Sequence, residues 1–173
     1  MIRLVFIAIL MFPTFVLSNE CGSLANKYGP FDYRDAYARK EKLPIVVDSH
    51  FTDVTYQLAL KGASDNEYMS KFKWGKVSTG TQKRTALPSD IDYTLRAFPN
   101  LPKALFAMSE YQRIVDIKTR KQRNYYSAEC YFKRAIEFAP DDSAVYLVYG
   151  IHYHKRKNYK KALEQYLIDR RNS

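Results

Sequence analysis

The spacing of apolar residues divides the chain into two halves of different character. From residue 89 onward, apolar side chains recur at helical spacing, and the only prolines, Pro99, Pro102 and Pro140, stand where helices are expected to meet. Residues 19–88 show no such sustained period. The pattern predicts a mainly α-helical protein, in which an irregular, partly helical amino-terminal half caps a helical region over residues 89–173.

One helix is expected within the amino-terminal half. A short β-branched run at Ile45–Val47 leads to Ser49, which can cap a helix that runs to about Lys61 and stops at Gly62. Residues 63–88 have weak periodicity, so we expect a long loop there, either a binding loop or a disordered one. The segment before the helix is expected to form an extended arm.

The first eighteen residues differ from both halves. Arg3 provides a basic start, an apolar run follows, and Val16 and Ser18 suit the −3 and −1 positions of a signal peptidase site. We therefore expect residues 1–18 to be a signal peptide cleaved after Ser18, and the protein to be exported to the periplasm. The alternative is a retained anchor, but the apolar run is shorter than the roughly 20 residues of a spanning helix and contains Pro13.

The chain carries a net charge of +10 and has a sequence pI of about 9.5. Such a charge attracts nucleic acid by releasing counterions from phosphate, yet export removes that ligand and no recognised nucleic-acid module is present. We expect no nucleic-acid partner. Anionic lipid, envelope polysaccharide and acidic protein surfaces remain as partners.

Two cysteines, Cys21 and Cys130, lie in the part of the chain that is expected to be exported. An even number of cysteines in an oxidising compartment permits one disulfide bridge between them. The alternative is that Cys130 is a buried thiol on a helix.

A repeat stands out near the carboxyl end. Three pairs of residues are each separated by 34 positions: Tyr125 and Tyr159, Ala128 and Ala162, and Phe132 and Tyr166. The second copy also contains Tyr146, Tyr149-Gly150 and Tyr153, and the first contains Ala135 and Pro140. These residues resemble the tetratricopeptide repeat, with aromatic replacements at its tryptophan and leucine positions.

The resemblance covers about residues 102–170. The second copy departs from the family at Asp169, and the first is stretched by about one or two turns before Tyr125. Together with the amino-terminal segments, the chain resembles small exported bacterial tetratricopeptide proteins, from which no activity is carried over. The resemblance implies two antiparallel helix pairs in which small Gly150 and Ala162 let the helices of a pair approach closely.

The resemblance also implies a concave face, made by the first helix of each unit, that binds a peptide or protein. Carried over by position, the face consists of Phe106, Glu110, Arg113, Leu147, Ile151, His154 and Lys155. We expect a non-enzymatic adaptor of the cell envelope that holds a protein or peptide on this face. The competing interpretation is that the amino-terminal cap covers Leu147 and Ile151.

Two basic runs occur where the helices of each unit join. They contain Lys118, Arg120, Lys121 and Arg123 in the first unit, and Arg156, Lys157, Lys160 and Lys161 in the second. Such runs are usually solvated turns, but together they can form a basic edge. The alternative function is therefore association of this edge with anionic lipid or polysaccharide.

Metal, cofactor and catalytic roles are not expected. His152 and His154 stand two apart on a helix and so point to different sides. Asp48, His50 and Asp53 suggest acid–base chemistry, but no nucleophile elbow, phosphate loop or paired-carboxylate motif accompanies them.

Overall fold

The computed structural model describes residues 21–24, 27–71, 86–115 and 126–173. These residues are mainly helical, and no strand occurs among them, which confirms the predicted mainly α-helical class. Within this described part, no helix is both long enough and apolar enough to cross a bilayer. The expected signal peptide, residues 1–18, lies outside it.

The amino-terminal half contains more helix than its sequence pattern predicts. It comprises a π-helical turn η1 (Ala38–Lys42), α1 (Leu43–His50), α2 (Asp53–Leu60) and α3 (Asp65–Lys71). A helix from Ser49 to Lys61 was expected, but the chain forms two helices that break at Phe51, and Thr52 rather than Ser49 caps α2 by accepting a hydrogen bond from the Thr55 amide at 3.3 Å.

Tertiary contacts explain the extra helices. Val46 lies in the β-branched run, yet it is helical because its side chain is buried in the core. Tyr68 anchors α3 in the same way, within the segment that was expected to be a loop. The predicted stop is confirmed, since α2 ends at Leu60 and Gly62 adopts a φ of 63°, which only glycine takes readily.

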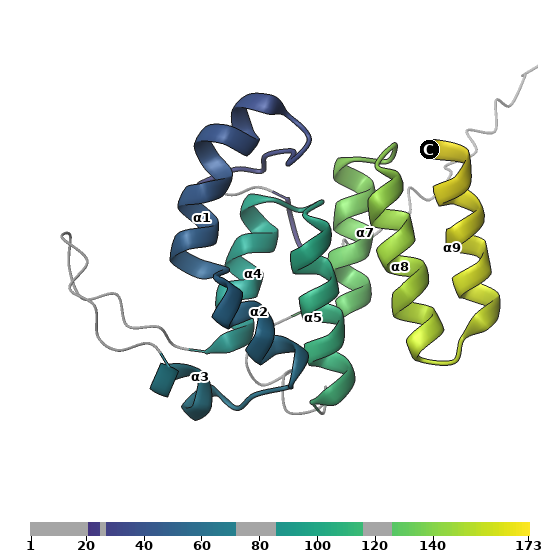
Figure 1. Ribbon diagram of the computed structural model, residues 1–173. Coiled ribbons are helices and arrows are strands. Elements are labelled where there is room, and N and C mark those ends of the chain that lie inside the picture. Colours follow the sequence, from purple (N-terminus) through teal and green to yellow (C-terminus); the bar gives the residue numbers. More distant parts are fainter. Residues whose placement is uncertain (1–20, 25–26, 72–85, 116–125) are drawn as a thin grey trace, which may run out of the picture.

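The carboxy-terminal region consists of α4 (Leu87–Ala97), α5 (Pro102–Ile114), α7 (Ala128–Phe138), α8 (Ser143–Lys155) and α9 (Tyr159–Asn172). These helices lie side by side and run alternately up and down, with α9 at one edge of the molecule (Figure 1). Helix α1 lies beside α4 at the other edge, and α2 packs against α4 and α5. The two halves therefore form one array.

Local sequence signals begin these helices. Ser127, Asp142 and Asn158 each accept a hydrogen bond from a backbone amide in the first turn of α7, α8 and α9, respectively. Pro102 occupies the first position of α5, where a missing amide hydrogen costs nothing. The helix junctions predicted at the prolines are thus present.

Helices α8 and α9 pack closely because their facing residues are small. A Cβ atom added to Gly150 would collide with the ring of Tyr166, and Ala162 is buried against α8. The close approach expected at Gly150 is therefore present. Tyr159, the first residue of α9, is 59% exposed.

One apolar core spans both halves. Its large, fully buried side chains include Phe51 and Tyr68 from the amino-terminal half, Leu87 and Leu105 from α4 and α5, and Phe132 from α7. Because the amino-terminal helices contribute to this core, they stabilise the carboxy-terminal helices rather than forming a separate domain.

A disulfide joins Cys21 to Cys130 on α7, with their Cα atoms 5.0 Å apart. The predicted bridge is confirmed. It closes a loop across 109 positions and fixes the start of the arm to the carboxy-terminal helices.

Polar contacts fix the next part of the arm. The Arg34 guanidinium donates to both carboxylate oxygens of Asp141, each at 3.1 Å, and also to Asp32. Buried Asn100, in the α4–α5 turn, donates to Asp32 at 2.8 Å and to Asp142 at 2.9 Å. The arm is thereby held to the α4–α5 and α7–α8 turns.

Candidate functional site

Seven residues of α5 and α8 form the candidate binding surface, called the α5–α8 face below. Phe106, Glu110 and Arg113 recur at helical spacing on α5, and Leu147, Ile151 and Lys155 do so on α8. His154 is the seventh member. Helices α5 and α8 pack against each other, so the two rows lie next to one another.

A buried carboxylate organises the polar part of this face. Glu110 accepts hydrogen bonds from Lys155 at 2.8 Å and from Arg113 at 3.0 Å, and its side chain is only 5% exposed. Burial opposes ionisation of Glu110, but the hydrogen bonds and charges of the two cations outweigh it and lower its pKa. Glu110 is therefore an internal anchor that positions two cations, rather than a contact residue.

The two cations remain accessible to a ligand. The side chains of Arg113 and Lys155 are 39% and 40% exposed, respectively. The Lys155 Nζ atom also lies 4.9 Å from the centre of the Phe106 ring, which holds the ammonium group over an aromatic surface. One carboxylate compensates two positive charges, so this part of the face keeps a net positive charge.

The apolar part of the face is uncovered. Leu147 is 43% exposed, and Ile151, one turn further along α8, is partly exposed. Helix α2 of the amino-terminal half packs on α4 and α5, but it leaves the Leu147 side chain open to solvent. The ring of His154, at the end of the row, makes an edge-to-face contact with the ring of Tyr159, with ring centres 5.3 Å apart.

A polar network lies beneath the face. Ser109 Oγ lies 2.9 Å from His152 Nδ1, and the Arg156 guanidinium donates to the Ser109 carbonyl at 2.9 Å and to Ser109 Oγ at 3.3 Å. Burial, and then the charge of Arg156, lower the pKa of His152 to about 3. Because Arg156 donates to Oγ, the Ser109 hydroxyl is free to donate to a neutral imidazole.

The same network contains the elements of a serine–histidine–carboxylate arrangement. His152 Nε2 lies 3.9 Å from Glu129 Oε1, on the other side of the imidazole from Ser109. However, Ser109 and His152 are 1% and 3% exposed, so no substrate reaches the hydroxyl. The network serves packing between α5 and α8 and offers no accessible nucleophile.

Only the second of the two basic runs of the predicted basic edge lies within the described residues. Lys118, Arg120, Lys121 and Arg123 lie outside the described residues. In the second run, Arg156 is half-buried in the network with Ser109, whereas Lys157, Lys160 and Lys161 are exposed around the α8–α9 turn. Lys161 additionally lies 5.1 Å from the ring centre of Tyr153.

One histidine–aspartate pair was not predicted from the sequence. His50 does not pair with Asp48 or Asp53; its Nδ1 atom lies 2.8 Å from Asp90 on α4, and the Tyr68 hydroxyl donates to the same carboxylate. Asp53 instead pairs with Lys103 at 3.0 Å. Asp90 carries no sequence signal that links it to His50, because the contact joins residues 40 positions apart.

The histidines of the described residues belong to no cluster of metal-binding side chains. Among the described residues, no group of three or more histidine, cysteine, aspartate or glutamate side chains is placed to hold a metal ion. Neighbouring His152 and His154 differ in environment, since the first is buried and the second exposed.

Comparison of the chain with protein-family models, with curated proteins and with solved structures found no match. The function must therefore be inferred from the residues and geometry of the chain itself.

Proposed function

We propose that this protein is a non-enzymatic adaptor that binds a peptide or protein segment on the α5–α8 face. The observation that carries the proposal is the placement of exposed Leu147 and partly exposed Ile151 beside two accessible cations held by buried Glu110. The positive charges of Arg113 and Lys155 favour an acidic ligand. The apolar side chains favour a ligand that also carries apolar residues.

We further infer that α5–α7 and α8–α9 are two tetratricopeptide-like units. Three observations support this inference: the 34-residue repeat, the alternating direction of the helices, and the close packing of Gly150 on Tyr166 (Figure 1). In this arrangement α5 and α8 are the first helices of successive units, which is where tetratricopeptide proteins place their ligand.

The cellular location that fits this proposal is the bacterial envelope, in the periplasm. Two features support export: the leader-like pattern that ends at Ser18 and the disulfide between Cys21 and Cys130. Disulfides form and persist in oxidising compartments and are rare in the cytosol.

Site-specific crosslinking in intact cells tests the proposal. A photoreactive amino acid placed at Leu147 is expected to capture an envelope protein or peptide, and the matched probe at Ile45, an exposed apolar residue on α1, is not. Mass spectrometry of the adduct names the partner. Adding Ile151→Asp should abolish the Leu147 adduct, whereas Ile45→Asp should leave it unchanged.

The proposal fails if Leu147 and Ile45 probes give the same adducts, or if Ile151→Asp leaves capture intact in a folded protein. Circular dichroism and the melting temperature of each variant establish that the fold survives. With this control, loss of the adduct reports on the face rather than on stability.

A second function is association of the α8–α9 turn with anionic lipid or polysaccharide. The observation that favours it is the cluster of exposed Lys157, Lys160 and Lys161 in one short stretch. Sedimentation with vesicles that contain or lack anionic lipid tests it. Binding that disappears in high salt and in Lys157→Glu/Lys160→Glu, but survives Ile151→Asp, would establish this function instead.

A further inference from the structure

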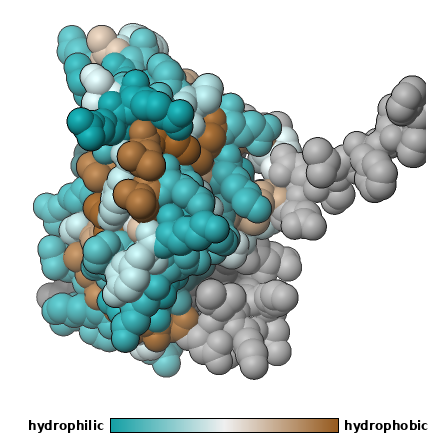
Figure 2. Space-filling model, turned by 90° about the vertical axis from the view of Figure 1, so that its right-hand side faces the viewer, coloured by the Kyte–Doolittle hydropathy of each residue, from teal (hydrophilic) through white to brown (hydrophobic). Residues whose placement is uncertain are grey.

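Helix α9 presents an apolar surface that no other described helix covers. Its inner side packs on α8 through Ala162 and Tyr166. On its outer side, Leu163 and Leu167 are 59% and 52% exposed. Figure 2 views the molecule from the α9 side and shows apolar residues running across this face between hydrophilic margins.

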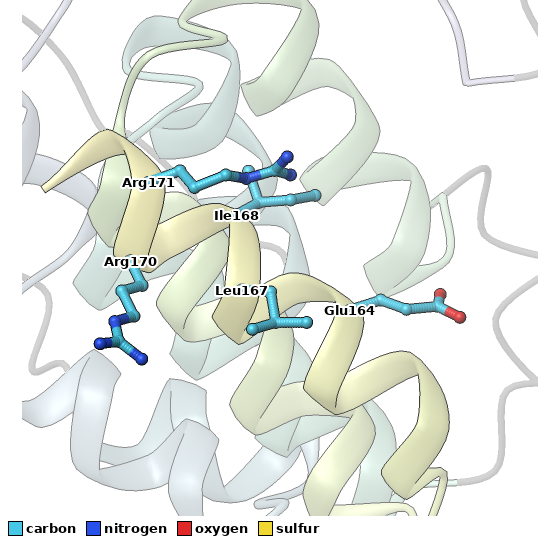
Figure 3. A pocket seen from close by; sticks show the side chains of 5 residues that line it. All are labelled: Glu164, Leu167, Ile168, Arg170 and Arg171. Carbon is cyan, nitrogen blue, oxygen red and sulfur yellow. The ribbon is translucent and has the colours of Figure 1, made fainter.

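Charged residues flank the apolar centre of this surface in a particular order. Along α9 the sequence places Glu164, then Leu167 and Ile168, then Arg171, so that each charged residue is three positions from the nearer apolar residue. Figure 3 shows the carboxylate at one end, the arginine side chains toward the carboxyl end of the helix, and Leu167 and Ile168 between them. These residues, with Arg170, line a shallow open pocket.

This order is self-complementary when two copies of α9 pair in antiparallel orientation. A second copy of α9 is rotated by 180° about an axis that passes midway between Leu167 and Ile168. Glu164 of each copy then lies opposite Arg171 of the other, and Leu167 of each lies opposite Ile168 of the other. A two-fold axis at this point generates both ion pairs and both apolar contacts from one surface, as an isologous interface requires.

We propose that the protein forms a symmetric dimer through antiparallel pairing of α9 with α9 of a second copy. The occupant is a second copy because the acidic and basic ends of the surface match each other across the two-fold axis. At a net charge of +10, two copies repel in general, so association depends on these local pairs.

The dimer is expected to be weak. Helix α9 has 14 residues and is therefore about 21 Å long. A contact limited to one face of such a helix is smaller than the roughly 800 Å² per partner of a standard interface. Dimers should accordingly accumulate only at protein concentrations of about 10 µM to 1 mM.

The proposal is tested by reversing single charges on α9 and measuring association of the variants, alone and mixed, with the protein as purified from cells. Sedimentation velocity of the unaltered protein should show a monomer–dimer equilibrium. Glu164→Arg and Arg171→Glu should each weaken association about tenfold or more, because each homodimer then contains two repulsive pairs. Glu137→Arg, a reversal at an exposed position on α7, is the matched control and should not change association.

Mixing the two reversed variants gives the decisive result. In a heterodimer of Glu164→Arg with Arg171→Glu, both pairs are again attractive, so an equimolar mixture should dimerise more strongly than either variant alone. Leu167→Asp should abolish association in every combination. A monomeric unaltered protein up to millimolar concentration, or a mixture that stays monomeric, overturns the proposal.

Discussion

His152 Nδ1 lies 2.9 Å from Ser109 Oγ, and this buried hydrogen bond joins α8 to α5 directly beneath the α5–α8 face. Burial keeps the imidazole neutral, with a pKa of about 3 against an ordinary value of 6.5. The geometry of the candidate binding face therefore depends on a histidine that must not be protonated.

Stability should fall as the pH drops below the ordinary pKa of histidine. The unfolded chain binds a proton near pH 6.5 and the folded protein only near pH 3, so protonation favours unfolding throughout this interval. The free energy of unfolding should fall by up to about 1.4 kcal/mol per pH unit. Urea unfolding between pH 7 and pH 5 measures this slope, before carboxylates such as Glu110 contribute.

His152→Gln should lower stability at pH 7 and flatten the slope between pH 7 and pH 5. The matched control is His154→Gln, since His154 is exposed and should leave the slope unchanged. A slope that persists in His152→Gln would show that another group is responsible.

Gly150→Ala should destabilise the protein by about 1–3 kcal/mol, because the new methyl group overlaps the Tyr166 ring. The direction of this change in stability is informative, because a glycine-to-alanine substitution within an exposed helix stabilises a protein by about 1 kcal/mol. In a Tyr166→Ala background the space is open and Gly150→Ala should become stabilising. Thermal unfolding of the four proteins in this double-mutant cycle measures the effect; additive changes would exclude the clash.

Reduction of the disulfide should lower the melting temperature. Cys21 and Cys130 close a loop of 109 positions, and loss of a native disulfide typically costs about 2–5 kcal/mol. Cys21→Ser/Cys130→Ser should melt at the lower temperature and should not respond to a reducing agent. Equal melting of the unaltered protein with and without reductant would contradict a stabilising bridge.

The helices near the carboxyl end could be predicted because their signals are local. Ser127, Asp142 and Asn158 cap helices with their own side chains, and Gly150 marks the close helix pair. The amino-terminal half was less predictable, because Val46 and Tyr68 are helical through contacts with distant residues, which override a β-branched run and a weak period.

For the candidate site, the resemblance to the tetratricopeptide repeat predicted that Phe106, Leu147 and Lys155 share one face. It did not reveal that Glu110 is buried as their anchor, or that His50 pairs with Asp90, since these contacts join separate helices. The sequence by itself determined the helical character of the carboxy-terminal half, because helical periodicity depends on neighbours three or four positions away. Only the tertiary structure decided which polar groups become partners and which apolar surfaces stay exposed, because packing joins residues distant in the chain.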